Sequence, residues 1–536
     1  MTENERKPTK ALLPLAALSG ALAGLAALAV AEAVAGGVRP QAGPVVAVGG
    51  AAIDRTPAAV KDWAIRHFGT DDKLFLQLGI LAVLALFALA LGMVALRFRR
   101  TGAAGVLLFG VVGAVAATGR PDSTGITDAL PSVAGAVVGA GVLYVLAGRL
   151  RPRAATATAT ATATADTVAP PGAGWDRRGF VIAASAAAVG SAGAGLLGRS
   201  LSGAGGRDAV ASRQNLVLPT PGSRARAVPK GAQLRVPGVS PFITPNGDFY
   251  RVDTALVVPK IDATTWRLRV HGQGVRRPLT LTFDDLLRRD LVERDITLTC
   301  VSNEVGGPYV GNARWIGVQL ADLLAELGVK PPSEGGPADQ LVARSVDGMT
   351  IGSPVEDLMD GRDALLAVGM NGEPLPFAYG FPVRMVVPGL YGFVSACKWI
   401  KDIELTTFDA YDPYWVKRGW ARRAPIKTES RIDTPKPFAR PRAGTVMVAG
   451  VAWAQHRGID RVEVRVDDGP WQEARLAAED TRDTWRQWSF PWQATEGGHT
   501  LTVRATDRTG ALQTAHRAQT IPDGASGRHS VVVTVD

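Results

Sequence analysis

Long hydrophobic runs fill the chain before residue 200, and shorter patterned segments follow. Five of the runs predict membrane-spanning helices, and most have the roughly 17–25 residues that cross a bilayer. The third run is shorter, and the third and fifth are rich in Ala and Gly. A cleaved signal peptide is the alternative for the first run, but further spans follow it, which favours an integral membrane domain. The five runs are Ala11–Ala35, Leu74–Leu96, Ala103–Ala117, Ala129–Ala147 and Phe180–Leu197.

Residues 237–436 mix short strand patterns with short helix patterns. The segments "TWRLRVHG", "LTLTF" and "DITLT" alternate as half-buried strands do, whereas "TFDDLLRRD" and "VQLADLLAELG" have helical spacing. No regular strand–helix alternation and no Gly-rich phosphate loop occurs in this region. The pattern therefore predicts an α+β domain rather than a Rossmann sheet.

The last hundred or so residues predict an all-β domain. After the Pro-rich stretch "TPKPFARP", alternating runs such as "DRVEVRVDDGPW", "GGHTLTVRATD" and "RHSVVVTVD" are separated by turn residues. This spacing predicts an immunoglobulin-like β-sandwich without a Cys pair. Four tryptophans are expected in its core: Trp453, Trp471, Trp488 and Trp492.

These patterns divide the chain into four parts. Residues 1–198 form an α-helical membrane bundle, 199–236 a flexible extracytoplasmic linker, 237–436 the α+β domain and 437–536 the sandwich. The linker is assigned from its Gly, Ser, Arg and Pro content. The low-complexity stretch at 154–166 is expected to be a flexible cytoplasmic connection between the fourth and fifth spans.

Basic residues predict the orientation of the spans. Clusters of Lys and Arg precede the first span and separate the second from the third and the fourth from the fifth, whereas the loop at 119–128 has only Arg120 beside Asp122 and Asp128. The positive-inside rule then places the N-terminus in the cytoplasm and everything after the fifth span outside. An even number of spans would reverse that last conclusion. The expected location is a bacterial cell membrane, with a multi-pass anchor and an extracytoplasmic main domain.

The stretch "DRRGF" resembles a twin-arginine export signal, because Arg177, Arg178 and Phe180 precede a weakly hydrophobic span. Arginines that flank any span on its cytoplasmic side are an equal alternative. The formal net charge of the 536 residues is +10, but the excess is scattered and partly reflects this topological bias. The charge therefore calls for no nucleic-acid partner, and the hydrophobic spans make a lipid bilayer the expected partner.

Only two cysteines occur in the chain, Cys300 and Cys397. Cys300 ends a predicted strand, where a loop containing Asn, Gly and Pro begins. A buried core thiol is the common role of such a residue. A nucleophile, a redox thiol, a metal ligand and a disulfide with Cys397 are the other roles that this position allows.

Four segments, in matching order and spacing, resemble the sulfite oxidase-like molybdopterin oxidoreductases of the membrane-anchored bacterial type. They are "TPNGDFYRVD" (244–253), "ITLTCVSN" (296–303), "GNARWIGVQLADLL" (311–324) and "MNGEPLPFAYGFPVRMVVPGLYGFVSACKWIKDIEL" (370–405). The resemblance covers roughly residues 236–536. It implies a molybdenum–molybdopterin cofactor, an enzyme that transfers an oxygen atom to or from a small molecule, and a C-terminal domain that often forms a homodimer.

The resemblance also assigns residues. Cys300 would bind molybdenum through its thiolate, beside the dithiolene of the pterin, and a soft sulfur suits a high-valent metal. Cys397 matches no ligand position and is expected in the core. The expected cofactor-binding residues are Asn246, Tyr250, Arg251, Ser345, Tyr379, Arg384, Ser395 and Lys398. For Arg384, the alternative role is a structural salt bridge. For most of the other residues, the alternative is an ordinary loop residue without contact to a cofactor.

Two departures from the family bear on the substrate. Sulfite-oxidising relatives place arginines after the cysteine, whereas Val301 and Glu304 stand in that stretch here; Tyr379 and Gly380 stand where relatives commonly have His. Loss of positive charge disfavours a dianion such as sulfite. The alternatives are a reductase of sulfoxides or N-oxides, and a non-catalytic envelope protein that keeps the fold.

No haem or iron–sulfur cluster is expected. Of six histidines only His67 precedes residue 200, and it is expected in a loop; no CxxC cluster occurs. Electrons would then pass to or from a separate protein or a quinone-linked carrier.

Overall fold

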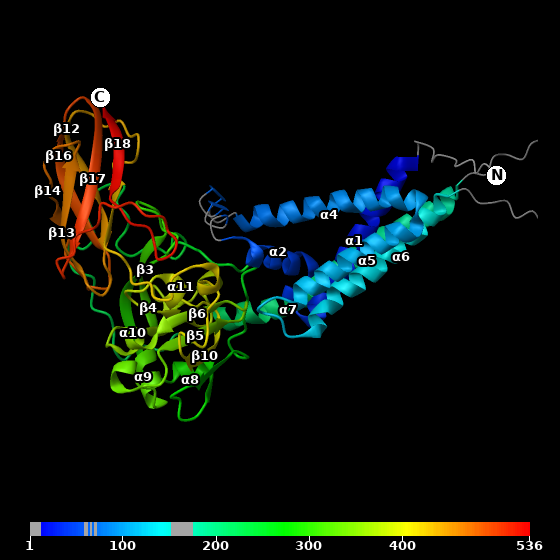
Figure 1. Cartoon of the computed structure of the whole chain (residues 1–536), viewed down its shortest axis with the longest axis horizontal. Helices are drawn as coiled ribbons and strands as arrows, with labels where there is room; N and C mark the ends of the chain where they lie inside the picture. Colours follow the sequence, from blue (N-terminus) through cyan, green and yellow to red (C-terminus); the bar gives the residue numbers. More distant parts are fainter. Residues whose placement is uncertain (1–11, 58–59, 61–62, 65–66, 69–71, 152–174) are drawn as a thin grey trace, which may run out of the picture. The chain divides into compact units, whose positions relative to one another are not determined.

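The computed structural model describes the chain except for residues 1–11, 58–59, 61–62, 65–66, 69–71 and 152–174. The predicted low-complexity connection at 154–166 lies outside the described residues. The chain divides into two compact units: residues 1–207 with 254–257, and residues 208–253 with 258–536. Within the described residues, helices make up the first unit, and all of the strands belong to the second (Figure 1).

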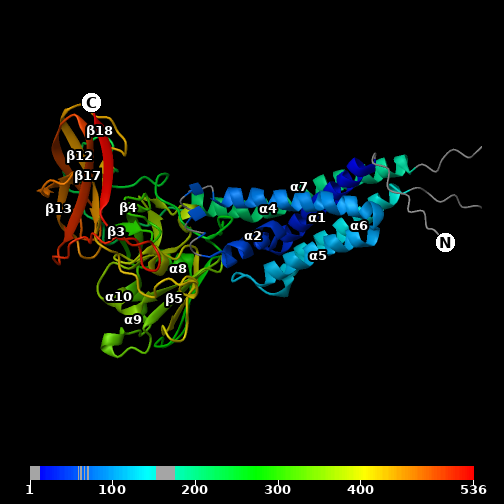
Figure 2. The same ribbon diagram turned by 45° about the horizontal axis from the view of Figure 1, so that its top comes forward.

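Within the described residues, five helices are long and apolar enough to cross a membrane. Together with a shorter helix, α2, they form a bundle in which the long helices run lengthwise beside one another (Figures 1 and 2). The five predicted spans are therefore confirmed as helices, including the third, which is longer than its hydrophobic run. The helices are α1 (Leu13–Val38), α2 (Pro44–Arg55), α4 (Asp72–Arg97), α5 (Arg99–Thr118), α6 (Leu130–Arg149) and α7 (Arg177–Gln214).

Small residues let these helices pack closely. At Gly92 of α4, a Cβ atom would lie 2.2 Å from the carbonyl oxygen of Ala16 in α1, and at Gly135 of α6 it would lie 2.3 Å from that of Ala27. Close backbone approach through Gly and Ala is a common way for helices to associate in lipid. The Gly and Ala content that weakens the hydrophobic signal of these runs therefore serves their packing.

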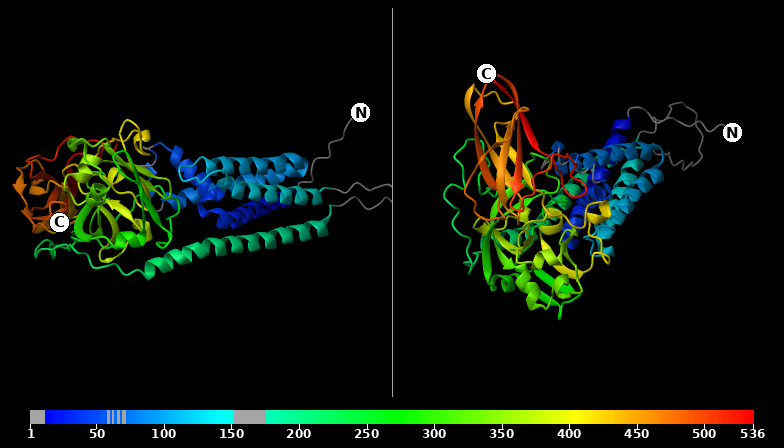
Figure 3. Two further views of the ribbon diagram at one scale, coloured as in Figure 1. Left: turned by 90° about the horizontal axis from the view of Figure 1, so that it is seen from below. Right: turned by 60° about the vertical axis from the view of Figure 1, so that its left-hand side comes forward.

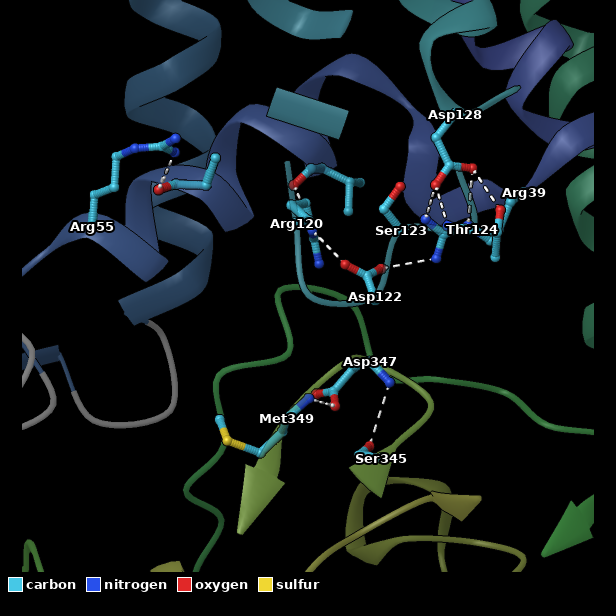
Figure 4. A network of polar contacts seen from close by, with 12 residues as sticks. Arg39, Arg55, Arg120, Asp122, Ser123, Thr124, Asp128, Ser345, Asp347 and Met349 are labelled. Carbon is cyan, nitrogen blue, oxygen red and sulfur yellow. Dashed lines mark hydrogen bonds and ion pairs between the residues drawn. The ribbon is translucent and has the colours of Figure 1, made fainter. Parts of the chain in front are cut away.

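An ion-pair network orders one end of the bundle (Figure 4). Arg39, which follows α1, pairs with Asp122 at 2.9 Å and with Asp128 at 2.7 Å, and both carboxylate side chains are fully buried. Arg120 pairs with Asp122 at 2.7 Å and donates to the carbonyl oxygen of Val46 in α2. The sparsely charged loop at 119–128 is therefore fixed by internal ion pairs.

Arginines gather where α4 and α6 end and where α5 and α7 begin. Arg99 donates to the carbonyl oxygen of Tyr144 at 2.8 Å, and Arg149 pairs with Asp176 at 2.6 Å. Arg151 donates to the carbonyl oxygen of Arg97. These residues belong to the clusters that determined the predicted orientation.

Two sheets with short helices form the first part of the second unit. One has the strand order β2-β1-β10-β5-β6, with β1 and β10 parallel; the other has the order β3-β4-β7-β8, with β9 paired to β7. This mixture matches the predicted α+β pattern. The strands are β1 (Arg267–Gly272), β2 (Leu279–Thr282), β3 (Leu291–Thr299), β4 (Val310–Gln319), β5 (Gln340–Ser345), β6 (Thr350–Pro354), β7 (Leu365–Met370), β8 (Glu373–Pro374), β9 (Arg384–Val386) and β10 (Ile400–Thr406), and the helices are α8 (Phe283–Leu287), α9 (Leu320–Glu326), α10 (Val355–Met359) and α11 (Gly392–Ser395).

The C-terminal part consists of two four-stranded sheets around one apolar core (Figure 3, orange to red). Trp488 and Trp492 lie in that core, and Trp453 is fully buried, as expected. Trp471 does not: it lies half-buried, with the guanidinium groups of three arginines within about 5 Å of its ring. The strands are β11 (Glu429–Thr434), β12 (Gly444–Trp453), β13 (Ile459–Val466), β14 (Gln472–Glu473), β15 (Arg475–Leu476), β16 (Arg486–Ala494), β17 (Gly497–Asp507) and β18 (His529–Val535).

Three expectations about local structure need correction. The segment predicted to be a flexible linker begins as helix, since α7 extends to Gln214, and Ser223 later pairs with Val292 of β3. β11 lies before the predicted boundary at 436/437 but pairs with β12 in the sandwich. His67 has helical backbone and bonds the carbonyl of Trp63 at 2.8 Å, rather than lying in a loop.

Candidate functional site

Cys300 follows directly on β3 and opens the turn that leads into β4. We call residues 300–309 the cysteine loop. Its backbone closes on itself: Cys300 N–H donates to the carbonyl oxygen of Tyr309 at 2.9 Å, and Asn303 N–H donates to that of Cys300 at 3.0 Å. The side-chain oxygen of Asn303 accepts from Tyr309 N–H at 2.8 Å. Cys300 is half-buried, so its thiol lies at the end of a rigid strand with an open side.

The two cysteines differ in environment, and in the described chain they are separate thiols rather than a disulfide. Cys397 is buried, and burial raises the pKa of its thiol strongly. A thiol that holds its proton so firmly is a poor nucleophile and a poor ligand. Cys397 therefore has the properties of a core residue, which leaves Cys300 as the candidate for chemistry.

Arg384, the first residue of β9, is a buried cation. Its guanidinium donates to the carbonyl oxygens of Met385 and Tyr379, both at 3.3 Å, and lies 5.1 Å from the ring of Trp315. No Asp or Glu in the described chain pairs with it, and burial lowers the pKa of Arg384 to about 10. A buried charge without a counter-ion is costly unless a ligand supplies one. The structural salt bridge considered for Arg384 is therefore absent among the described residues.

Lys398 and Arg251 converge on one carboxylate. The ammonium of Lys398 pairs with Asp253 at 2.7 Å, and Nε of Arg251 pairs with the same oxygen at 3.0 Å. Gly380 packs against both Arg384 and Lys398: a Cβ there would lie 3.0 Å from the Cβ of Arg384 and 3.2 Å from that of Lys398. Four of the predicted positions, Tyr379, Arg384, Lys398 and Arg251, are thus connected through Gly380 and Asp253. Asp253 was missed, although it stands two residues after Arg251 in a quoted segment.

Aromatic rings connect Cys300 to this cationic group. Tyr250 stacks on Phe249 at 5.1 Å, and Tyr379 donates its hydroxyl to the carbonyl oxygen of Phe249. Burial raises the pKa of the Tyr250 phenol, and the nearby Cys300 raises it further. Tyr250 therefore remains a neutral hydroxyl beside the thiol. The ring of Tyr309, from the cysteine loop itself, lies 6.4 Å from that of Tyr250 and was not singled out from the sequence.

Three predicted positions have polar groups engaged within the fold. Asn246 accepts from the amide of Asn371 at 2.8 Å. The hydroxyl of Ser395 donates to the carbonyl oxygens of Leu390 and Tyr391, both at 3.0 Å. Ser345 is buried at the end of β5, and its hydroxyl accepts from Asp347 N–H at 3.3 Å (Figure 4). These contacts fix each side chain within the fold.

Asp347 is a further acidic group near Lys398 that the sequence did not single out. Its carboxylate accepts from Met349 N–H at 3.2 Å (Figure 4). Burial raises the pKa of Asp347, whereas Ser345, Met349 and Lys398 act in the opposite direction. The turn "SVDG" that carries it is a common position for such a side chain.

The residues present fit the cofactor that the resemblance implies. Arg384 is a buried cation that lacks a carboxylate, which suits an anionic pterin group. In the described chain, no group of three or more His, Cys, Asp or Glu side chains could hold a metal ion. A dithiolene pterin would supply further sulfur ligands to a metal held by Cys300.

Comparisons with known proteins agree. Residues 255–415 match the family described as oxidoreductase molybdopterin binding domain. Mitochondrial sulfite oxidase of Mus musculus is 32% identical over 293 residues, which are 47% of this chain and 53% of the mouse protein. The uncharacterized oxidoreductase YuiH of Bacillus subtilis is 33% identical over 162 residues, 30% of this chain and 75% of YuiH.

A solved structure, the sulfane dehydrogenase SoxCD from Paracoccus pantotrophus, is 26% identical, with a TM-score of 0.47 over 55% of this chain and 83% of that one. The chain spans about half the length of the sulfite oxidases that it matches. Because 75% of YuiH is covered at 33% identity and the molybdopterin-binding family model matches, the chain belongs to the sulfite oxidase-like molybdopterin-dependent oxidoreductases.

Proposed function

We propose that this chain is a membrane-anchored, extracytoplasmic enzyme that transfers an oxygen atom to or from a small molecule other than sulfite. The observation that carries the proposal is the pairing of two unusual groups in one unit. One is Cys300, half-exposed on a rigid strand end, and the other is Arg384, buried without a carboxylate. Tyr250 interacts electrostatically with both Cys300 and Arg384.

The chain's own residues would bind and orient the cofactor. Cys300 would hold the metal through its thiolate. Arg384 would neutralise an anionic part of the pterin. In the structure the guanidinium of Arg384 makes only two long hydrogen bonds, both to backbone carbonyl oxygens at 3.3 Å. Lys398 and Arg251, fixed on Asp253, would bind a second anionic group, because two cations share one carboxylate. When bound, the molybdenum–pterin group supplies oxygen-atom transfer and two-electron redox chemistry.

The roles of Asn246, Tyr250, Ser345, Tyr379 and Ser395 remain part of this proposal. Tyr250 and Tyr379 are the better supported of the five, because both contact Arg384 or the residues beside it. For Asn246, Ser345 and Ser395, backbone amides and carbonyls near these side chains are the groups we expect to face the cofactor.

The composition of the cysteine loop disfavours sulfite as substrate. Its ionisable side chains are Cys300, Glu304 and Tyr309, none of them a cation. A dianion would approach a negative side chain where sulfite-oxidising relatives carry arginine, which is electrostatically unfavourable. Reduction of a neutral sulfoxide or N-oxide is the second candidate function, and the same Glu304 favours it.

The location of the enzyme follows from the anchor. Five helices of membrane length and the arginine clusters at the ends of α4 and α6 support a cytoplasmic N-terminus and an extracytoplasmic second unit. Electrons would pass to or from a separate protein or quinone-linked carrier, and the C-terminal sandwich, of immunoglobulin-like type, would support a homodimer.

The test uses the full chain, produced in a host that makes the cofactor and purified in detergent beside its Cys300→Ser variant. Near-stoichiometric molybdenum and pterin, with altered metal coordination in the variant, are expected. Activity with sulfite and with a neutral sulfoxide is then compared. Absence of both metal and pterin from a well-folded chain would contradict the proposal, and faster turnover of sulfite than of any neutral substrate would contradict the substrate class.

A further inference from the structure

The cysteine loop is bonded to the C-terminal sandwich through Arg431. Arg431 lies on β11, and its Nη1 donates to the carbonyl oxygen of Gly307 at 2.7 Å. The same guanidinium donates to Ser240 at 3.0 Å and pairs with Asp433 at 2.7 Å, and its side chain is 10% exposed. Asp433 neutralises the charge of Arg431. The hydrogen bond to Gly307 therefore fixes the position of the loop backbone and adds no net charge near it.

His529, at the start of β18, packs against Gly306, the residue before Gly307 in the loop. Its Nδ1 accepts from Ile432 N–H at 3.0 Å, which fixes the ring. A Cβ on Gly306 would lie 2.2 Å from Cδ2 and 2.3 Å from Nε2 of that ring. Gly306 also has a φ of +81°, a conformation that other residues rarely adopt. The backbone of the loop thus rests directly on the imidazole.

The strand that leads to Cys300 is held from the same side. Trp485 N–H donates to the hydroxyl of Thr297 at 2.8 Å, and Thr297 N–H donates to the carbonyl oxygen of Asp483 at 2.9 Å. The buried amide of Gln455 donates to the carbonyl oxygen of Thr297 and to the hydroxyl of Thr299, at 2.9 and 3.0 Å. The sandwich therefore supports both the last residues of β3 and the loop that follows.

We propose that Arg431 and His529 are positioning residues that hold the cysteine loop, and with it the thiol of Cys300, in the conformation used for metal binding. The inference rests on the proposed function for the role of Cys300. Metal ligands need supporting contacts that orient them, and loss of such contacts typically weakens metal binding or activity by about 10–100-fold. The sandwich then contributes to the catalytic centre, beyond any part in dimer formation.

The sharpest test is a double-mutant cycle between Gly306→Ala and His529→Asn. Asn at 529 keeps an oxygen that can accept from Ile432 N–H but removes the ring from under the loop. We expect Gly306→Ala alone to displace the loop and to raise the alkylation rate of Cys300 about fivefold, the factor that roughly 1 kcal/mol of lost loop stability gives. In the double variant the part of the increase that comes from the clash with the ring should disappear, whereas the part that comes from the positive φ of residue 306 should remain, so the two effects are less than additive.

Alkylation is measured on the full chain in detergent, produced without pterin, with the Cys300 peptide quantified by mass spectrometry. His499→Asn is the matched control, because His499 bonds Asp467 and Thr495 rather than the loop. Melting temperatures of all variants separate local displacement from unfolding. Additive effects of the two substitutions would overturn the proposal.

A second measurement uses the cofactor-loaded chain and Arg431→Lys, which keeps the charge beside Asp433 but loses the fork that reaches Gly307. We expect the molybdenum X-ray absorption spectrum to change in Arg431→Lys and to stay unchanged in His499→Asn. An unchanged spectrum in Arg431→Lys would overturn the role of Arg431. Cys300→Ser separates this inference from the proposed function. If it also left the spectrum unchanged, Cys300 would not be the metal ligand. Rescue in the alkylation cycle would still show that His529 positions the loop.

Discussion

At the scale of single residues, substitution can show whether Arg384 binds the cofactor or only stabilises the fold. Replacing a buried cation that lacks a counter-ion by an apolar side chain of similar size removes the cost of desolvating its charge. We therefore expect Arg384→Met to leave the melting temperature of the pterin-free chain unchanged or higher, while the pterin content of the loaded chain falls about tenfold or more, as for loss of 1.4 kcal/mol of binding. Calorimetry and pterin fluorescence measure the two effects.

Arg362 is the matched control for that prediction. It is also buried, but it pairs with Asp357 at 2.8 Å and with Asp360 at 2.7 Å. Arg362→Met should lower the free energy of unfolding by about 1–3 kcal/mol, because it leaves carboxylate acceptors without their donor. A melting temperature that falls equally in both variants would show that Arg384 is structural.

Another residue-scale prediction concerns Glu429, which lies on β11 and is 6% exposed. Burial raises the pKa of its carboxyl to about 8, although Lys427 and Arg517 oppose the shift. Between the ordinary value of 4.5 and about 8, the folded chain holds a proton that the unfolded chain has lost. The free energy of unfolding must then fall as pH rises through that window.

Glu429→Gln should remove this part of the pH dependence, measured as melting temperatures at pH 5 and pH 8.5. Glu463→Gln is the control: a hydrogen bond from Arg504 lowers the pKa of Glu463, so its contribution changes only below its ordinary value of 4.5. A slope that is the same in Glu429→Gln and in wild type would contradict the prediction.

The sequence singled out Cys300 and Arg384, because a strand end and a motif position are properties of the local chain; their roles in holding a cofactor stay predictions. It did not predict Asp253 or Asp347, whose significance comes from Lys398, a residue far away in sequence. Trp471 was misplaced for a similar reason. Alternation shows which face of a strand a residue occupies, but only the folded sheets show that Arg465, Arg504 and Arg528 surround this ring.

At the scale of elements, the helices of the first unit depend on glycine contacts that hydropathy does not register. Gly92 and Gly79 lie on the same helix, α4, yet a Cβ at Gly92 would meet the backbone of α1 and one at Gly79 would meet nothing within 4 Å. Gly92→Val should destabilise the bundle by about 1–3 kcal/mol through overpacking.

Gly79→Val should have little effect, since that position is open. The comparison is made on the full chain in detergent, as the temperature at which half of the protein leaves the monodisperse peak in size-exclusion chromatography. Equal losses in the two variants would show that helix propensity, and not contact between α1 and α4, is responsible.

Element boundaries were the least predictable feature of the fold. The periodicity of residues 200–214 is weak, and α7 continues through them because tertiary contacts, such as Arg213 with the carbonyl oxygen of Leu375 at 2.8 Å, hold its end. β11 precedes the Pro-rich stretch that seemed to mark a boundary, and its pairing with β12 is a long-range property. Strand existence, in contrast, followed from alternation alone in β1, β3, β13 and β17.

At the scale of the whole molecule, the proposed extracytoplasmic location would link export to cofactor loading. A cofactor held, as proposed, by Arg251, Cys300 and Arg384, which are distant from one another in sequence, would require a folded domain. If the cofactor is inserted in the cytoplasm, the second unit must cross the membrane after folding, which a twin-arginine route permits. The pair Arg177–Arg178 at the start of α7 is the candidate signal.

Replacing both Arg177 and Arg178 by Lys keeps the positive charge, so the positive-inside rule predicts no change in orientation. The start of α7 should also persist, because Asp176 accepts from Gly179 N–H at 2.8 Å and pairs with Arg149 at 2.6 Å. Recognition of the arginine pair itself is the property that changes. We therefore expect the second unit of this variant to stay in the cytoplasm, protected from protease added to intact cells, whereas Arg149→Lys with Arg151→Lys leaves it accessible. Normal accessibility of the Arg177/Arg178 variant would show that these arginines act only as flanking charges and that another route exports the domain.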